Sequence, residues 1–142
     1  MTAKSFIDTN ILVYAASKAA VDQPKRQAAR GLLSRPDLGF SAQVLQEFYT
    51  VAISKQHLQM THDEAVAVLQ SLAAFPVCPI SRDLVFEAID AKQRFGISYW
   101  DAAILAAAKA MGCHTVFSED LNAGQNYEGV TIVNPFANIP SP

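Results

Sequence analysis

Short apolar runs alternate with helical stretches along the whole chain. The expected strands are runs without helical periodicity, at residues 5–7, 38–40, 77–80, 114–117 and 130–133. The expected helices have apolar positions at helical spacing or capping signals, at residues 24–33, 41–54, 61–74, 81–96 and 98–112. Repeated strand–helix order predicts parallel pairing with helices on both faces. We therefore expect an α/β fold in one domain, residues 1–142: a three-layer α/β/α sandwich around a short, mostly parallel sheet.

Two acidic sites directly follow expected strands. Asp8 comes after the strand at residues 5–7, and Glu119 and Asp120 follow the strand at residues 114–117. In parallel sheets, ligands bind beyond the carboxyl ends of the strands. The alternatives are a turn or helix cap for Asp8 and a surface loop for residues 118–120. Because successive strand residues point to opposite faces, we expect only one of Glu119 and Asp120 to face Asp8.

Two further acids lie in expected helices. Glu47 is at the rim of the apolar stripe of its helix and has no basic residue four positions on. Its alternative reading is a solvated charge beside the core. Asp101 begins a helix that is apolar nearly all round, so we expect that helix to be buried. Ser98 and Asp101 also fit a capping box, which is the structural alternative for this acid.

Together these acids predict a metal site. A cluster of carboxylates is stabilised by a bound cation, since the charges otherwise repel. Oxygen ligands without His or Cys favour Mg²⁺, with Mn²⁺ also suitable. A cation held in this way suits hydrolysis of phosphoryl esters.

Four short motifs resemble those of PIN-domain ribonucleases, in particular the VapC-like toxins of type II toxin–antitoxin modules. They are residues 6–10 (FIDTN), 41–48 (Ser41 with VLQEF), 98–102 (SYWDA) and 118–121 (SEDL). Residues 133–136 (VNPF) also resemble a frequent ending of these proteins. Ser118 stands where the family commonly has Thr, and each motif is short, so the resemblance rests on their order and spacing.

The resemblance implies an endoribonuclease that uses Mg²⁺ or Mn²⁺, forms a homodimer and is silenced by a cognate antitoxin. Structured RNA, often tRNA, is the substrate class of such toxins. The implied catalytic and metal-binding residues are Asp8, Glu47, Asp101 and Asp120. Residues assigned to support the site or hydrogen-bond phosphate are Thr9, Asn10, Ser41 and Ser118.

RNA binding has to rest on a local patch, because the net charge of the chain is −2. The basic candidates lie in the segment around the helix at residues 24–33, and they are Lys25, Arg26 and Arg30. A basic segment of this kind attracts the phosphate backbone. The alternative is a solvated helix face.

Other functions stay open. A phosphatase with Asp8 as covalent nucleophile is one, although such enzymes usually carry an Asp two residues on, where this chain has Asn10. A catalytically inactive PIN-fold binding module is the other. We expect a cytoplasmic protein without a membrane segment, with no signal peptide and with Cys78 and Cys113 as reduced, buried thiols.

Overall fold

In the described part of the chain, residues 3–55 and 58–140 of a computed structural model, six short strands form one sheet. Their spatial order is β3-β2-β1-β4-β6-β5. The strands are β1 (Ser5–Ile7), β2 (Leu38–Ser41), β3 (Val77–Cys78), β4 (Thr115–Phe117), β5 (Asn126–Tyr127) and β6 (Val130–Val133). Only the β5–β6 hairpin is antiparallel among these pairs, so the expected mostly parallel sheet is confirmed.

The strand register brings the expected acidic segments to one edge of the sheet. In the β1–β4 pair, Ile7 lies opposite Phe117, so both strands end at the same level. Asp8 and Ser118 therefore leave the sheet side by side. The backbone N–H of Asp8 donates to the carbonyl of Phe117 at 3.1 Å, which extends the pairing past the strand ends.

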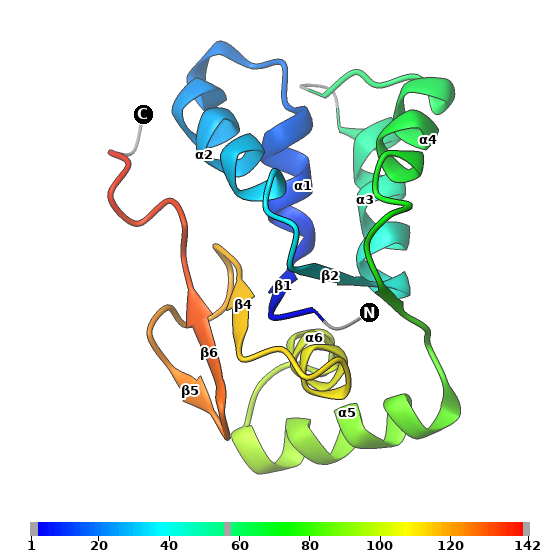
Figure 1. Cartoon of the computed structure of the whole chain (residues 1–142), viewed down its shortest axis with the longest axis vertical. Helices are drawn as coiled ribbons and strands as arrows, with labels where there is room; N and C mark the ends of the chain where they lie inside the picture. The colour runs from blue at the N-terminus through cyan, green and yellow to red at the C-terminus, as the bar shows by residue number, and fades with distance from the viewer. Residues whose placement is uncertain (1–2, 56–57, 141–142) are drawn as a thin grey trace.

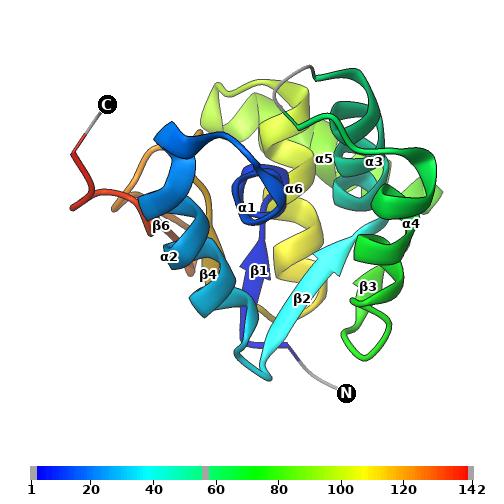
Figure 2. The ribbon, with the colours of Figure 1, turned by 90° about the horizontal axis from the view of Figure 1, so that it is seen from above.

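Helices cover both faces of the sheet. They are α1 (Thr9–Ala16), α2 (Gln23–Leu33), α3 (Ala42–Ser54), α4 (His62–Gln70), α5 (Arg82–Phe95) and α6 (Tyr99–Ala110), with a short 3₁₀ turn η1 (Ala20–Asp22). The helices from α1 to α4 lie on one side of the strands and α5 and α6 on the other (Figures 1 and 2). This is the expected three-layer arrangement.

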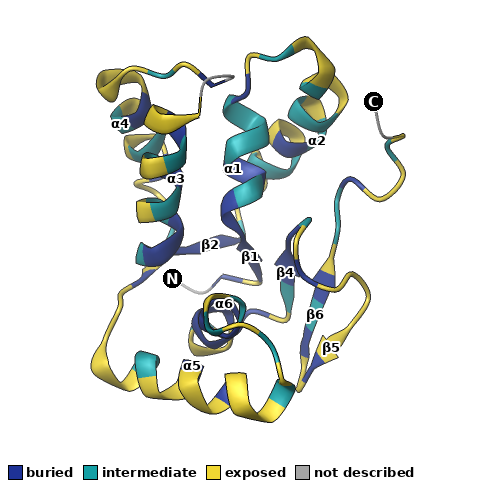
Figure 3. Ribbon diagram, turned by 180° about the vertical axis from the view of Figure 1, so that it is seen from behind, coloured by how far each residue is buried: buried dark blue, intermediate teal, exposed yellow. Residues whose placement is uncertain are grey.

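The core lies between the inner strands and their helices. Phe6, Phe40 and Val116 have no exposed surface, and α6 is buried from Ala102 to Ala108, as its apolar sequence predicts. By contrast, most of α5 is exposed (Figure 3). No helix among the described residues is long and apolar enough to cross a membrane.

Both cysteines are buried free thiols, as predicted. Burial raises the pKa of Cys113 to about 11. At neutral pH this thiol is therefore protonated and behaves as a small apolar side chain.

One helix was not predicted. Residues 9–16 form α1, with Asp8 as its N-cap. Asp8 and Asn10 at its start are typical of turns, and the following residues are too uniformly apolar to show a helical period. The helix forms because Ile11 and Leu12 pack into the core, where they are at most 1% exposed.

Two expected elements were too long, and one short strand was missed. Strand β3 ends at Cys78 because Pro79 lacks the N–H needed to continue a ladder. The helix beginning after Thr61 ends at Gln70, four residues early, and continues as turns. The two-residue strand β5 was missed because it forms only by pairing with β6.

Candidate active site

Asp8 is the most buried acid at the strand ends, with 7% of its surface exposed. One carboxylate oxygen accepts the N–H of Thr9 at 2.7 Å, and the other accepts the hydroxyl of Ser118 at 2.7 Å. Burial raises the pKa of Asp8 to about 6, and the charges of Asp120 and Glu47 add to the rise. The two hydrogen bonds act in the opposite direction. The fold thus holds a carboxylate that is costly to ionise without a cation.

Asn10 links Asp8 to the segment after β4. Its amide nitrogen lies 3.1 Å from Asp120 Oδ2 and 3.4 Å from Asp8 Oδ2. Its carbonyl oxygen accepts the backbone N–H of Glu119 at 3.1 Å. The hydroxyl of Ser118 accepts the backbone N–H of Asp120 at 3.1 Å. Asn10 and Ser118 therefore connect Asp8 to Asp120 through hydrogen bonds.

Glu119 and Asp120 have different surroundings. Asp120 is exposed and its carboxylate contacts Asn10. The carboxylate of Glu119 accepts hydrogen bonds from Tyr14 at 2.9 Å and Lys25 at 2.6 Å. The acid bridged to Asp8 is therefore Asp120, the residue that the motif assigns to the site.

Glu47 reaches the same region from α3. One of its oxygens accepts the hydroxyl of Thr9 at 3.2 Å, and the other accepts the Gln43 amide at 2.6 Å. Gln43, only 9% exposed, was missed by the sequence analysis. Its position four residues before Glu47 places both on one helix face, so the helical spacing contained this signal.

Asp101 lies apart from this network. Its backbone N–H is capped by the Ser98 hydroxyl at 3.1 Å, and its side chain is partly exposed in the first turn of α6. A weak link exists through Gln43, whose amide lies 3.5 Å from the carbonyl of Trp100. The structure thus brings together three of the four expected acids. Asp101 is connected to them only through the preceding residue, Trp100, whose carbonyl contacts Gln43.

Ser41 caps a helix rather than contacting the acids. Its hydroxyl accepts the N–H of Val44 at 3.2 Å and caps α3, and its side chain is buried. The structure shows no contact between this hydroxyl and the carboxylates.

A hollow of about 400 Å³ opens above the acids. It is lined by Thr9, Asn10, Val13, Tyr14, Asp22, Glu47, Val51, Glu119 and Asp120. In the described ranges, no three acidic, His or Cys side chains are close enough to hold a metal ion as they stand. The donor type nevertheless fits Mg²⁺ or Mn²⁺, because the acids that line the hollow and Asp8, which contacts Asn10 in that lining, supply only oxygens.

The sequence matches one known family over most of its length. The PIN domain model matches residues 5–127. The chain belongs to the PIN domain family. The resemblance inferred from the four short motifs is confirmed.

Solved structures with the same fold include toxin–antitoxin proteins. VapC20 of Mycobacterium tuberculosis, described as a sarcin–ricin loop cleaving toxin, has a TM-score of 0.66 and 21% identity over 82% of this chain and 90% of that one. A toxin–antitoxin complex from Klebsiella pneumoniae has a TM-score of 0.65 and 21% identity over 93% of this chain and 98% of that one. DNA-bound VapBC from Salmonella typhimurium has a TM-score of 0.64 and 18% identity over 92% of this chain and 96% of that one. These likenesses show the PIN fold. No curated protein sequence matches this chain.

All three basic residues expected to bind RNA make hydrogen bonds or ion pairs within the chain. Lys25 pairs with Glu119. Arg26 donates to the carbonyls of Ser17 at 2.9 Å and Ala19 at 3.2 Å. Arg30 donates to the carbonyl of Ala15 at 2.9 Å. The two arginines thus hold the C-terminal end of α1, which sequence patterns did not indicate.

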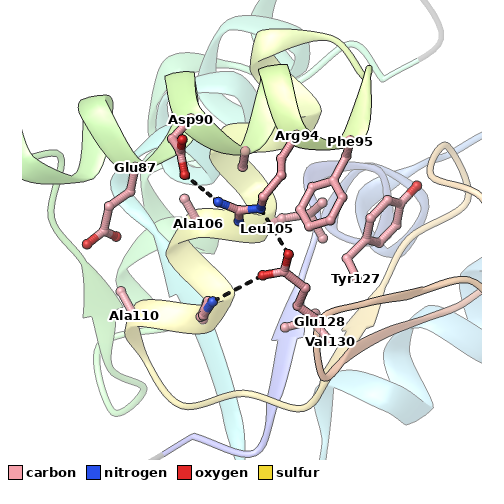
Figure 4. Close-up of a pocket in the computed structure, with 12 residues that line it drawn as sticks. Glu87, Asp90, Arg94, Phe95, Leu105, Ala106, Ala110, Tyr127, Glu128 and Val130 are labelled. Carbon is pink, nitrogen blue, oxygen red and sulfur yellow. Dashed lines mark hydrogen bonds and ion pairs between the residues drawn. The ribbon is translucent and has the colours of Figure 1, made fainter.

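A second hollow, of about 370 Å³, lies between α5, α6 and the β5–β6 hairpin (Figure 4). Four of its charged side chains form an ion-pair network: Glu128 accepts from Arg94 at 2.9 Å and lies 3.7 Å from Lys109, and Arg94 also contacts Asp90. None of its lining residues belongs to the carboxylate cluster. We therefore place the candidate active site at the ends of β1 and β4.

Proposed function

We propose that this PIN domain is a metal-dependent endoribonuclease. One observation carries the proposal: Glu47 and Asp120, distant in sequence, line a single hollow, and Asn10 in the same lining joins Asp120 to the buried Asp8 at the carboxyl ends of the parallel strands. The raised pKa of Asp8, about 6, supports cation binding there because a cation offsets the cost of its buried charge.

In this proposal the four acids are metal ligands with different positions at the site. Asp8, Asp120 and Glu47 would hold the metal, directly or through water, with Asp8 as the buried member and the other two in the lining of the hollow. Asp101, at the start of α6, is the fourth proposed ligand and lies apart from the other three in this structure. A bound Mg²⁺ or Mn²⁺ makes a water molecule more acidic and offsets charge on the phosphate. Thr9, Asn10 and Ser118 orient the carboxylates through the hydrogen bonds described above.

The sequence disfavours the phosphatase alternative, because Asn10 stands two residues after Asp8, where such enzymes usually carry a second Asp. An amide cannot act there as an acid or base. The inactive binding module differs only in activity, so an assay decides between it and the enzyme.

We further propose that the enzyme is a toxin with a cognate antitoxin, on the basis of the VapBC and toxin–antitoxin neighbours. Structured RNA such as tRNA is the proposed substrate, and the cytoplasm is the proposed compartment. A homodimer is proposed too, and exposed apolar side chains such as Phe86 (58%) and Ile89 (43%) on α5 offer surface for it. Growth arrest on expression, relieved by the small protein encoded beside it, tests the toxin role.

The test of activity is cleavage of purified tRNA by the purified chain. We expect cleavage with Mg²⁺ or Mn²⁺ and none in excess EDTA. Because water attacks, the products should carry 5′-phosphate and 3′-hydroxyl ends. Undiminished cleavage in EDTA, or a 2′,3′-cyclic phosphate as first product, would contradict the mechanism.

Matched variants separate the alternatives. Asp8→Asn should abolish cleavage, whereas Asp83→Asn, an exposed acid in the first turn of α5, should leave it unchanged. Turnover of p-nitrophenyl phosphate with intact RNA would support the phosphatase. A folded chain without either activity, across several structured RNAs, would support the binding module.

A further inference from the structure

Lys25 and Glu119 form an ion pair between α2 and the segment after β4. The Lys25 ammonium lies 2.6 Å from Glu119 Oε2, and the Tyr14 hydroxyl donates to Glu119 Oε1 at 2.9 Å. Lys25 also lies 3.3 Å from the Tyr14 hydroxyl. Both carboxylate oxygens of Glu119 are therefore engaged by residues from two other elements, α1 and α2.

This cluster is partly shielded from water. The side chains of Lys25 and Glu119 are 22% and 25% exposed. The ammonium lies 4.8 Å from the ring centre of Tyr14 and 5.6 Å from that of Phe136, and these two rings pack edge to face. The hydrogen bond with Glu119 raises the pKa of Lys25, so its charge is retained at neutral pH. A shielded charge pair restricts motion more than an exposed one.

The cluster adjoins the candidate active site through the backbone. Glu119 is flanked by Ser118, which donates to Asp8, and by Asp120, which contacts Asn10. The N–H of Glu119 itself donates to Asn10. Fixing the Glu119 side chain therefore fixes the segment that carries Asp120.

We propose that Lys25 is a positioning residue that acts through Glu119 to hold Asp120 at the carboxylate cluster. Its effect on catalysis rests on the proposed nuclease function, but its effect on the order of residues 118–121 does not. The proposal excludes Lys25 as an RNA-phosphate contact, because its ammonium is committed to Glu119 and Tyr14. Glu119 is likewise excluded as a metal ligand.

A double-mutant cycle tests this with Lys25→Met, Glu119→Gln and the double variant. Each single change should lower kcat about tenfold with little change in KM, and the double variant should lose no more than either single one. Amide hydrogen exchange of residues 118–121, in EDTA, should be about tenfold faster in all three variants. Lys25→Arg should retain most of the activity, since guanidinium also pairs with a carboxylate.

The control is another lysine–glutamate pair, Lys109 and Glu128, 3.7 Å apart with side chains 62% and 48% exposed. Lys109→Met should leave kcat and the exchange of residues 118–121 unchanged.

Two results would overturn the proposal. In the first, the kcat losses of the two single variants multiply in the double variant, and Lys25→Met still weakens the salt dependence of RNA binding when Glu119→Gln is present. That result would identify Lys25 as a phosphate contact. The other is unchanged exchange of residues 118–121. If the wild type cleaves no RNA, the proposed function fails, while the exchange cycle still decides the role of Lys25.

Discussion

Replacing Asp8 by Asn removes a buried charge while keeping the shape of the side chain. In the folded protein the pKa of Asp8 rises from 3.8 to about 6, mainly through burial. The folded state therefore binds this proton more tightly than the unfolded state. The free energy of unfolding falls as the pH rises through this window, and above pH 6 the whole penalty is present. Below pH 4 the penalty disappears.

The rise of about two pKa units corresponds to roughly 3 kcal/mol. Asn escapes this penalty but places an amide nitrogen against one of the two donors, Thr9 N–H or Ser118 hydroxyl, which removes about 1–2 kcal/mol of the gain. We therefore expect Asp8→Asn to be roughly 1–2 kcal/mol more stable than the wild type at pH 8 without metal. For a chain of this length that raises Tm by about 3–7 °C.

Thermal unfolding in EDTA between pH 4 and pH 8 measures this difference. The two Tm curves should cross between pH 4 and pH 6. Near pH 4 the variant should be the less stable protein, because only the hydrogen-bond cost of about 1–2 kcal/mol remains, and above pH 6 it should be the more stable one. Adding Mn²⁺ should raise the Tm of the wild type and have little effect on the variant, because binding to the folded state stabilises it. Asp63→Asn, an exposed acid in the first turn of α4, serves as control and should give no gain. A variant less stable than the wild type at pH 8, or a pH-independent difference, would refute the reasoning.

Three further experiments test the site and the proposed RNA-binding residues. Asp120→Asn should lower cleavage at least about a hundredfold, more than Glu119→Gln, and calorimetry should show weaker Mn²⁺ binding; the reverse ranking would make Glu119 the ligand. Gln43→Leu should lower kcat about tenfold by freeing Glu47, with near-normal Tm, and an unchanged kcat would remove Gln43 from the site. Arg26→Ala with Arg30→Ala should weaken RNA binding and reduce the salt slope by about two, provided that circular dichroism shows an intact fold; an unchanged slope would assign both arginines to the end of α1 alone.

Local sequence signals predicted many of the helix starts and ends without any knowledge of tertiary contacts. Helix starts at Ser41, Thr61, Ser81 and Ser98 follow from side chains that cap their own helix, within three residues along the chain. The end of α5 at Gly96 follows from its left-handed backbone, φ 65°. Such signals are short-range, so a sequence shows them directly. Helix α1 has no visible period, and only core packing reveals it.

The candidate site was predictable in its acids and not in their connections. Strand order in the sequence indicated that Asp8 and Asp120 follow strands, and parallel pairing of β1 and β4 brings them together. The partners that hold them depend on tertiary structure, because Lys25 and Glu119 are 94 residues apart and Asn10 and Asp120 are 110 apart. No spacing rule relates residues at such distances. The sequence by itself therefore determined which chemical groups are present and which elements carry them. Only the packing of α1 and α2 against the end of β4 decided which acid is bridged to Asp8 and which is held by a lysine.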